Sequence, residues 1–293
     1  MLQKIRRLSA VAYRLAGAFI LLALLTVAGG FTSGSASGKT VEDFSILPLS
    51  GQTVQELVVE NPLGPVEVAY KEQAQPEIRI QKTGRGVRAA LTQRSLDSVK
   101  IEVSEEEGVL RIATRPPRTP GWWFSATVRL TVVLPNQSLQ NISLTVRKGE
   151  IAIRGIRVRD QVTASTGNGE IDVLNAAGKF DLATSDGKIL LENVDLRPGS
   201  RIVSSRGAIS GRLRIWAPGS YHLETLRGDI AVTLTDLTPV EIEASASRGN
   251  FRIKGLPGLV IDEMGPSRVR AHIGTGEVQL NLNSQDGDIA ISK

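Results

Sequence analysis

The stretch Thr166-Gly-Asn-Gly-Glu-Ile-Asp-Val173 contains a phrase that recurs through the second half of the chain. The phrase is a small hydroxyl residue, two variable positions, glycine, one further position and an alternating apolar pair. It returns as Thr184-Ser-Asp-Gly-Lys-Ile-Leu-Leu191, Ser204-Ser-Arg-Gly-Ala-Ile-Ser-Gly211 and Thr225-Leu-Arg-Gly-Asp-Ile-Ala-Val232. Apolar residues in alternation are typical of a strand with one buried face. Glycine suits the turn before it, because it adopts positive φ without steric cost.

The phrase has a period near 20 residues. Its glycines stand at Gly149, Gly169, Gly187, Gly207, Gly228, Gly249, Gly276 and Gly287. The last two intervals together span 38 residues, which predicts two coils with one displaced turn. A second apolar pair precedes the glycine by seven and five residues in most repeats, so each repeat contains two short strands.

This period predicts stacked coils, because one coil of about 20 residues cannot bury its apolar face alone. Stacking at about 4.8 Å pairs each strand with its neighbours and buries a continuous apolar column. We therefore predict an all-β protein, a β-solenoid or parallel β-helix-like stack of ~20-residue coils. An antiparallel meander is the alternative that the same alternation permits, but the constant register of the phrase favours coils.

Four segments are predicted: a signal peptide or membrane anchor (1–31), a tether (32–53), an N-terminal β-rich capping part (54–145) and the β-repeat solenoid (146–293). In residues 1–31 a basic stretch precedes an apolar run and small residues, the order of an export signal. The apolar run covers 14 residues, or 17 if extended to Phe31. A spanning helix needs about 20. A cleaved signal and an anchor that enters the membrane through residues 15–31 both remain open. We expect an exported protein on the periplasmic or extracellular side of the cell envelope.

The capping part contains strands without the clean register. Leu57–Gly64 followed by Val66–Val68 reads as a diverged first coil, and Val99–Ile112 reads as a hairpin. Residues 126–134, ended by Pro135, form the strongest single predicted strand.

The pattern resembles the bacterial β-strand-repeat family whose members are named putative adhesins, a domain of unknown function. The resemblance runs from about Val54 to Ile291 and includes the strand end Val-Leu-Pro135 before the first clean repeat. It implies a β-helix-like fold at the cell envelope, with an N-terminal export or anchor segment. It implies little about activity, because no catalytic motif defines the family.

Composition excludes several kinds of site. The chain has no cysteine and two histidines, which excludes a thiolate metal site, a cysteine nucleophile and a multi-histidine metal centre. The formal charge of +5 includes four basic residues and no acid in residues 1–31, so the rest is nearly neutral and nucleic acid is not an expected partner. Nucleophile-elbow, phosphate-loop and dinucleotide motifs are absent. We predict no catalytic, cofactor-binding or metal-binding residues, and place His222 and His272 on the surface.

Acidic residues recur at the position after the turn glycine, where stacking would align them in a row. Such a row could bind a cation or act as a general acid and base. Lys188, Ala208 and Asn250 interrupt it, which favours a solvated turn edge. The acidic members are Glu150, Glu170, Asp229, Glu277 and Asp288.

Three consecutive aromatic residues, Trp122, Trp123 and Phe124, follow a proline-rich stretch from Arg115. They are either an exposed platform for a glycan, a lipid surface or a protein, or a plug for one end of the solenoid. The plug is the favoured interpretation.

The sequence ends with the apolar pair Ile289 and Ile291, two residues before the last position. Either an earlier segment covers this coil or its edge pairs with another chain, and we expect weak self-association or partner docking there.

Two classes of function follow from these features. The first is a non-enzymatic exported cell-envelope module, an adhesin or scaffold that binds an envelope protein or a glycan, with a role in envelope-stress sensing as a variant. The alternative is a carbohydrate-active β-helix enzyme that acts on polysaccharide.

Overall fold

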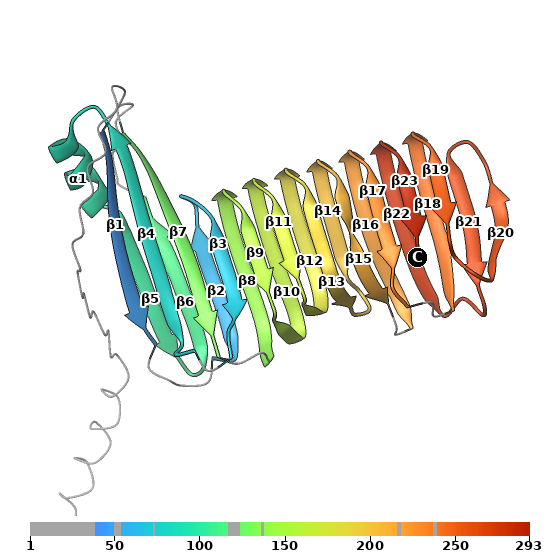
Figure 1. Cartoon of the computed structure of the whole chain (residues 1–293), viewed down its shortest axis with the longest axis horizontal. Coiled ribbons are helices and arrows are strands. Elements are labelled where there is room, and N and C mark those ends of the chain that lie inside the picture. The colour runs from blue at the N-terminus through green and yellow to red at the C-terminus, as the bar shows by residue number, and fades with distance from the viewer. Residues whose placement is uncertain are drawn as a thin grey trace, which may run out of the picture.

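The computed structural model describes residues 39–49, 54–72, 74–116, 124–135, 138–215, 218–236 and 239–293. This part of the chain is all-β apart from one short helix, α1 (Ala89–Asp97). The strands form two ladders that run side by side along an elongated body (Figure 1). Within the described ranges no helix is long and apolar enough to cross a membrane.

The first ladder, ladder A, is parallel through its centre and antiparallel at both ends. In the order of pairing it consists of β5 (Lys100–Glu106), β6 (Val109–Arg115), β2 (Glu56–Asn61), β8 (Ser138–Lys148), β10 (Arg157–Asn168), β12 (Ala177–Asp186), β14 (Arg201–Arg206), β16 (Gly219–Arg227), β22 (Val278–Asp286), β18 (Val240–Arg248), β21 (Arg268–Ile273) and β20 (Leu259–Met264).

The second ladder, ladder B, is antiparallel only at its N-terminal end. Its order is β1 (Lys39–Pro48), β4 (Glu77–Gly86), β7 (Phe124–Leu134), β3 (Val66–Tyr70), β9 (Ile151–Arg154), β11 (Ile171–Leu174), β13 (Ile189–Leu196), β15 (Ile209–Ile215), β17 (Ile230–Leu234), β23 (Ile289–Ser292) and β19 (Phe251–Lys254).

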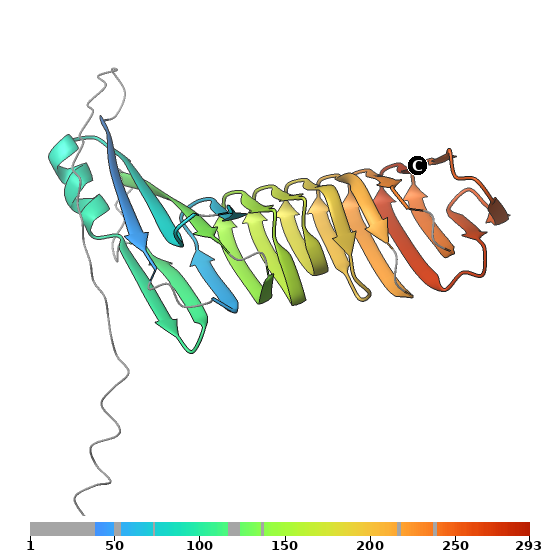
Figure 2. The ribbon, with the colours of Figure 1, turned by 60° about the horizontal axis from the view of Figure 1, so that its bottom comes forward.

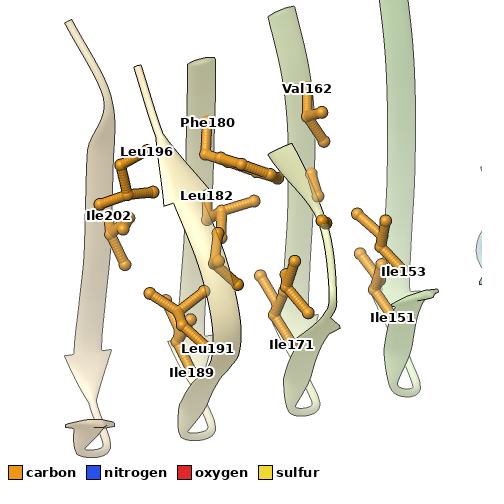
Figure 3. Packing of buried hydrophobic residues seen from close by; sticks show 14 of the residues in the cluster. Ile151, Ile153, Val162, Ile171, Phe180, Leu182, Ile189, Leu191, Leu196 and Ile202 are labelled. Carbon is orange, nitrogen blue, oxygen red and sulfur yellow. The ribbon is translucent and has the colours of Figure 1, made fainter. Parts of the chain in front are cut away.

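Each repeat contributes one strand to each ladder, as predicted, and we call this unit a coil. Within a coil the chain leaves ladder A, turns at glycine and enters ladder B. Parallel pairing places Ile171 between Ile151 of the preceding coil and Ile189 of the next. These side chains point between the ladders, where they meet residues of ladder A such as Phe180 and Leu182 (Figure 3). The parallel register excludes the antiparallel meander for the central repeats.

The repeated phrase is explained by a column of glycines at the turn between the ladders. A methyl group added to Gly169 would lie 1.9 Å from the carbonyl oxygen of Gly149, and Gly187 and Gly207 are equally close to the turn before them. In five coils a hydroxyl residue stands three positions before the glycine and donates to the glycine carbonyl of the coil stacked before it. Distances are 3.0 Å from Thr166, 2.9 Å from Thr184, 3.0 Å from Ser204, 3.1 Å from Thr225 and 3.0 Å from Ser284. The hydroxyls thus satisfy carbonyls at the turn where the backbones approach most closely.

The coils do not stack in chain order at the C-terminal end. β22 and β23 lie between the coil β16–β17 and the coil β18–β19, so Gly287 stacks on Gly228 and Gly249 stacks on Gly287. The predicted coil at Gly276 is wrong, because residues 259–273 form the antiparallel hairpin β20–β21 instead. The predicted open edge at Ile289 is also wrong: β23 is paired on both sides, and Ile289 is 1% exposed.

The N-terminal part extends the same stack. Strands β2 and β3 form the expected first coil, β5 and β6 form the expected hairpin, and β7 includes the expected long strand. The predicted tether is wrong for Lys39–Pro48, because these residues form β1 and pair with β4 (Figure 2). Helix α1 was not expected. It has no side-chain N-cap bond and no acid in its first turn, so packing against β1 and β4 stabilises it.

Candidate functional site

Phe124, the last residue of the aromatic stretch proposed as a binding surface, lies at the N-terminal end of the stack. Phe124 begins β7 and is 8% exposed. A methyl group added to Gly84 would lie 3.2 Å from the Phe124 ring and 3.5 Å from Leu96 of α1, so these side chains converge beside β4. Phe124 is therefore a packed residue. Trp122 and Trp123 lie outside the described residues.

The predicted acidic row is held by hydrogen bonds and ion pairs at the turn edge. Lys188 lies 3.3 Å from Glu170, and the Asp288 amide donates to Asp229 over 2.8 Å. The backbone amide of Asn250 donates to Asp288 over 2.8 Å. Within the described residues, no three His, Asp or Glu side chains are placed to hold a metal ion.

Glu277 does not belong to the acidic row, because the coil assigned to Gly276 does not exist. The two histidines stand at the surface beside carboxylates, with His222 3.3 Å from Glu224 and His272 2.8 Å from Asp262.

A polar groove lies elsewhere, at the corner where the chain leaves ladder B. It spans coils from β10 to β17 and has a volume of about 440 Å³. Its lining residues are Arg157, Asn175, Ala176, Ala177, Asn193, Asp195, Arg214, Thr235 and Asp236.

Asparagine forms the corner because the backbone there is left-handed. Asn175 has a φ of 53° and Asn193 a φ of 54°, and Gly155 fills the equivalent position of the preceding coil with a φ of 71°. Asparagine tolerates this conformation better than most residues with a side chain. The side-chain amide of Asn193 donates from Nδ2 to Asn175 Oδ1 over 3.1 Å. The side-chain NH₂ group of Asn175 takes no part in this bond.

A row of residues in register, all charged except Ala177, crosses the groove from coil to coil. Arg157 pairs in register with Ala177, Ala177 with Asp195, and Asp195 with Arg214. Arg214 Nε donates to Asp195 Oδ1 over 2.7 Å, its Nη2 contacts the other Asp195 oxygen, and Asp236 lies 3.8 Å away. The hydrogen bond with Asp195, and then the charges of Asp195 and Asp236, raise the pKa of Arg214 above its ordinary value.

Arg157 stands apart from this network. Its neighbour in the row is Ala177, whose short side chain leaves a notch between Arg157 and Asp195. No hydrogen bond or ion pair joins the Arg157 guanidinium to another residue in the described part of the chain. The groove therefore presents two arginines and two aspartates together with two side-chain amides. Arg214 is shared between Asp195 and Asp236, whereas Arg157 has no ion-pair partner among the described residues.

This groove was not predicted from the sequence, although the residues at the corner follow a pattern that the sequence shows. In four coils the position six residues after the turn glycine has positive φ, and it holds Gly155, Asn175, Asn193 and Gly255; the coils of Gly207 and Gly228 have leucine there instead. The positions eight residues after it include Arg157, Ala177 and Asp195. Reading these outer positions in register would have aligned the corner and the charged row.

Comparison with known families identifies the repeats. The model of the Toastrack family, DUF4097, matches residues 139–292, more than half of the chain. The chain belongs to the Toastrack family. The expected resemblance to a β-strand-repeat family of unknown function is thereby confirmed. No curated protein matches the chain.

Solved structures similar to this Toastrack chain come from bacteria. A putative cell adhesion protein from Clostridium sporogenes is 12% identical with a TM-score of 0.38, over 86% of this chain and 99% of that one. A putative adhesin from Bacteroides fragilis is 9% identical with a TM-score of 0.38, over 85% and 97%. A putative lipid binding protein from Parabacteroides distasonis is 12% identical with a TM-score of 0.28, over 86% and 97%.

Proposed function

We propose that this Toastrack chain is a non-enzymatic binding module of the cell envelope, whose corner groove binds an anionic glycan. The observation that carries the proposal is the guanidinium of Arg157, which has no partner among the described residues and lies beside the notch at Ala177. Guanidinium is the side-chain group best suited to carboxylate and phosphate oxygens, which it binds with two parallel hydrogen bonds.

The remaining groove residues suit sugar hydroxyls. The amides of Asn175 and Asn193 supply both donors and acceptors at the rim. A volume of about 440 Å³ lies within the range of small-ligand sites. A sugar that carries a carboxylate or a phosphate would place its charge at Arg157 and its hydroxyls at the asparagines.

The carboxylates of the groove support binding over cleavage. A glycoside hydrolase needs one carboxyl group that is protonated as an acid beside a second that is ionised. Here Asp195 forms a two-point ion pair with Arg214, and Asp236 faces the same guanidinium. Both carboxylates of the groove are therefore placed as partners of the Arg214 guanidinium.

The stacked coils are proposed to be a rigid β-solenoid scaffold that holds the groove outside the cytoplasm. Parallel ladders and the glycine column support the scaffold. The basic, apolar and small-residue order of residues 1–31 supports export, with the membrane entered through residues 15–31 if the segment is retained. Fractionation of cells should place the chain outside the cytosolic fraction; full-length protein in the cytosol would contradict export.

Titration calorimetry with a galacturonic acid oligomer and with a glycerol phosphate oligomer tests the groove. The affinities for the two oligomers show whether the groove prefers a carboxylate or a phosphate. Arg157→Gln should weaken binding about tenfold or more, because one charge-assisted bond contributes about 1.5–3 kcal/mol. Ala177→Leu should weaken it by filling the notch, whereas Arg111→Gln, at an exposed position of β6 away from the groove, should not change it.

Three results would contradict the proposed function. Neither oligomer binds at millimolar concentration, or a neutral galactose oligomer binds as well as the charged ones. Alternatively, the protein releases new reducing ends from the oligomer, which would establish an enzyme.

A further inference from the structure

The two ladders end at different places at the C-terminal end of the stack. Ladder A continues beyond β18 with the hairpin β21–β20, whereas ladder B stops at β19. Figures 1 and 2 show the hairpin extending past the last complete coil. In residues 239–293, which are all described, β19 pairs only with β23 and its other edge is open.

The inward face of the hairpin is only half covered as a result. Pairing across the hairpin places Ile261 opposite Ala271 and Met264 opposite Val269. Val269 and Ala271 are fully buried, but Ile261 is 48% exposed and Met264 is 69% exposed. The apolar column is therefore covered at β21 and exposed at β20, the last strand of ladder A.

The inward residues of β19 show the same incomplete burial. Phe251 and Ile253 are half-buried, while their counterparts in β23, Ile289 and Ile291, are 1% exposed. A strand added to the open edge of β19 would complete its backbone hydrogen bonds. That strand would continue ladder B level with β21, so its inward side chains would extend toward Ile261 and Met264 on the neighbouring strand β20. This is the geometry of strand addition to a sheet edge.

The charges on β19 determine what such a strand must look like. Its outward residues, Arg252 and Lys254, are exposed, and neither forms an ion pair in the described part of the chain. Side chains directly opposite each other on neighbouring strands attract when their charges are opposite. An incoming strand should therefore carry acids on its outward face and apolar residues on its inward face.

We propose that the open edge of β19 binds an extended segment of a partner protein in which acidic and apolar residues alternate. A second copy is a poorer occupant through this edge. Pairing two β19 strands would bring the Arg252 and Lys254 side chains of both copies together, and like charges in adjacent strands repel. The proposal does not depend on the glycan groove, which lies at a different part of the stack.

The chain itself supplies a probe with the required pattern. Residues 166–175, TGNGEIDVLN, carry Glu170 and Asp172 on the outward face of a coil, and Ile171 and Val173 on the inward face. A fluorescein-labelled peptide of this sequence should bind the full chain with a saturable change in anisotropy. A matched peptide, TGNGKIKVLN, reverses both charges and should bind much more weakly.

Charge exchange distinguishes the edge from non-specific attraction. The double variant Arg252→Glu, Lys254→Glu should lose about tenfold in affinity for the acidic peptide, since each opposite-charge pair contributes up to about 1 kcal/mol. The same variant should bind the lysine peptide better than the wild type does. Met264→Glu should weaken both peptides, because it places a charge where the inward residues pack. Arg157→Gln should leave peptide binding unchanged, which separates this edge from the groove.

Three outcomes would overturn the proposal. The wild type does not bind the acidic peptide at millimolar concentration, or charge reversal on β19 leaves affinity unchanged. In the third, sedimentation shows a dimer that Met264→Glu dissociates, which would assign the edge to a second copy.

Discussion

Replacing Gly169 by alanine tests the central packing feature of the stack. The added methyl group would lie 1.9 Å from the carbonyl oxygen of Gly149, and atoms of this kind do not approach within 3.0 Å. The obstacle is backbone, so the two coils must separate locally by more than about 1 Å. The backbone at Gly169 is not in the left-handed region. The substitution therefore tests close approach alone and not backbone conformation.

Separation of the two coils would break the hydrogen bonds that join them at this turn. The backbone amide of Gly149 donates to the backbone carbonyl of Asn168 over 2.9 Å, and that of Ile151 donates to the backbone carbonyl of Glu170 over 2.9 Å. The Thr166 hydroxyl donates to the Gly149 carbonyl over 3.0 Å. Three such bonds contribute about 1 kcal/mol each, so the free energy of unfolding should fall by about 3 kcal/mol. For a domain of this size the corresponding fall in Tm is about 6–12 °C.

Thermal unfolding followed by circular dichroism measures this change. Gly265→Ala is the control, because its nearest neighbour would be a carbonyl oxygen 3.5 Å away, an ordinary contact. The control should melt within about 2 °C of the wild type, which is the effect of a surface substitution. If Gly169→Ala melts with the control, the glycine column does not depend on close backbone approach and the explanation of the repeat is wrong.

Three further predictions concern the C-terminal coils and the groove. Ala246 stands where other coils have a hydroxyl residue, so Ala246→Ser should add a bond to the Gly287 carbonyl and raise the Tm by about 2–4 °C, measured by calorimetry. Ile289→Lys buries an unpaired charge in a strand paired on both sides, and should move the expressed protein to the insoluble fraction without altering the association state of any soluble remainder. The raised pKa of Arg214 means that its contribution to stability is complete below its ordinary pKa and is lost only as the pH rises through the higher folded value. The Tm difference between the wild type and Arg214→Gln should therefore stay constant between about pH 6 and pH 9, and a difference that disappears in this window would contradict the ion pair as its cause.

Much of the fold could be predicted from the sequence, because the same physical constraints act in every coil. Alternating apolar residues and the turn glycine recur at one register, so the sequence alone is enough to place Ile171 and Ile189 in one column. Helix α1 and β1 have no repeat to support them. They are short amphipathic segments whose conformation depends on contacts with β4.

The candidate site was less predictable, because its residues lie outside the repeated phrase. Asn175 and Arg157 look like ordinary turn and surface residues in isolation. Their role depends on which residues neighbour them in the stack. Ala177 leaves space beside Arg157, and Asp195 forms its hydrogen bond with Arg214 and not with Arg157. Only the coil-to-coil register places these residues together.

Small polar terms favour the exchanged order of the last coils. The coil of Gly287 has Ser284, which donates to the Gly228 carbonyl over 3.0 Å, whereas the coil of Gly249 offers only Ala246 at that position. Charges one residue before the glycine act in the same direction. Stacking in chain order would place Arg248 directly on Arg227, whereas the observed order inserts Asp286 between them and pairs it with Arg248 over 2.6 Å. A hydrogen bond contributes about 1 kcal/mol and an exposed charge pair a few tenths, and both terms favour the observed order. The same terms leave the coil without a hydroxyl at the end of the stack, where its open edge is available to another strand.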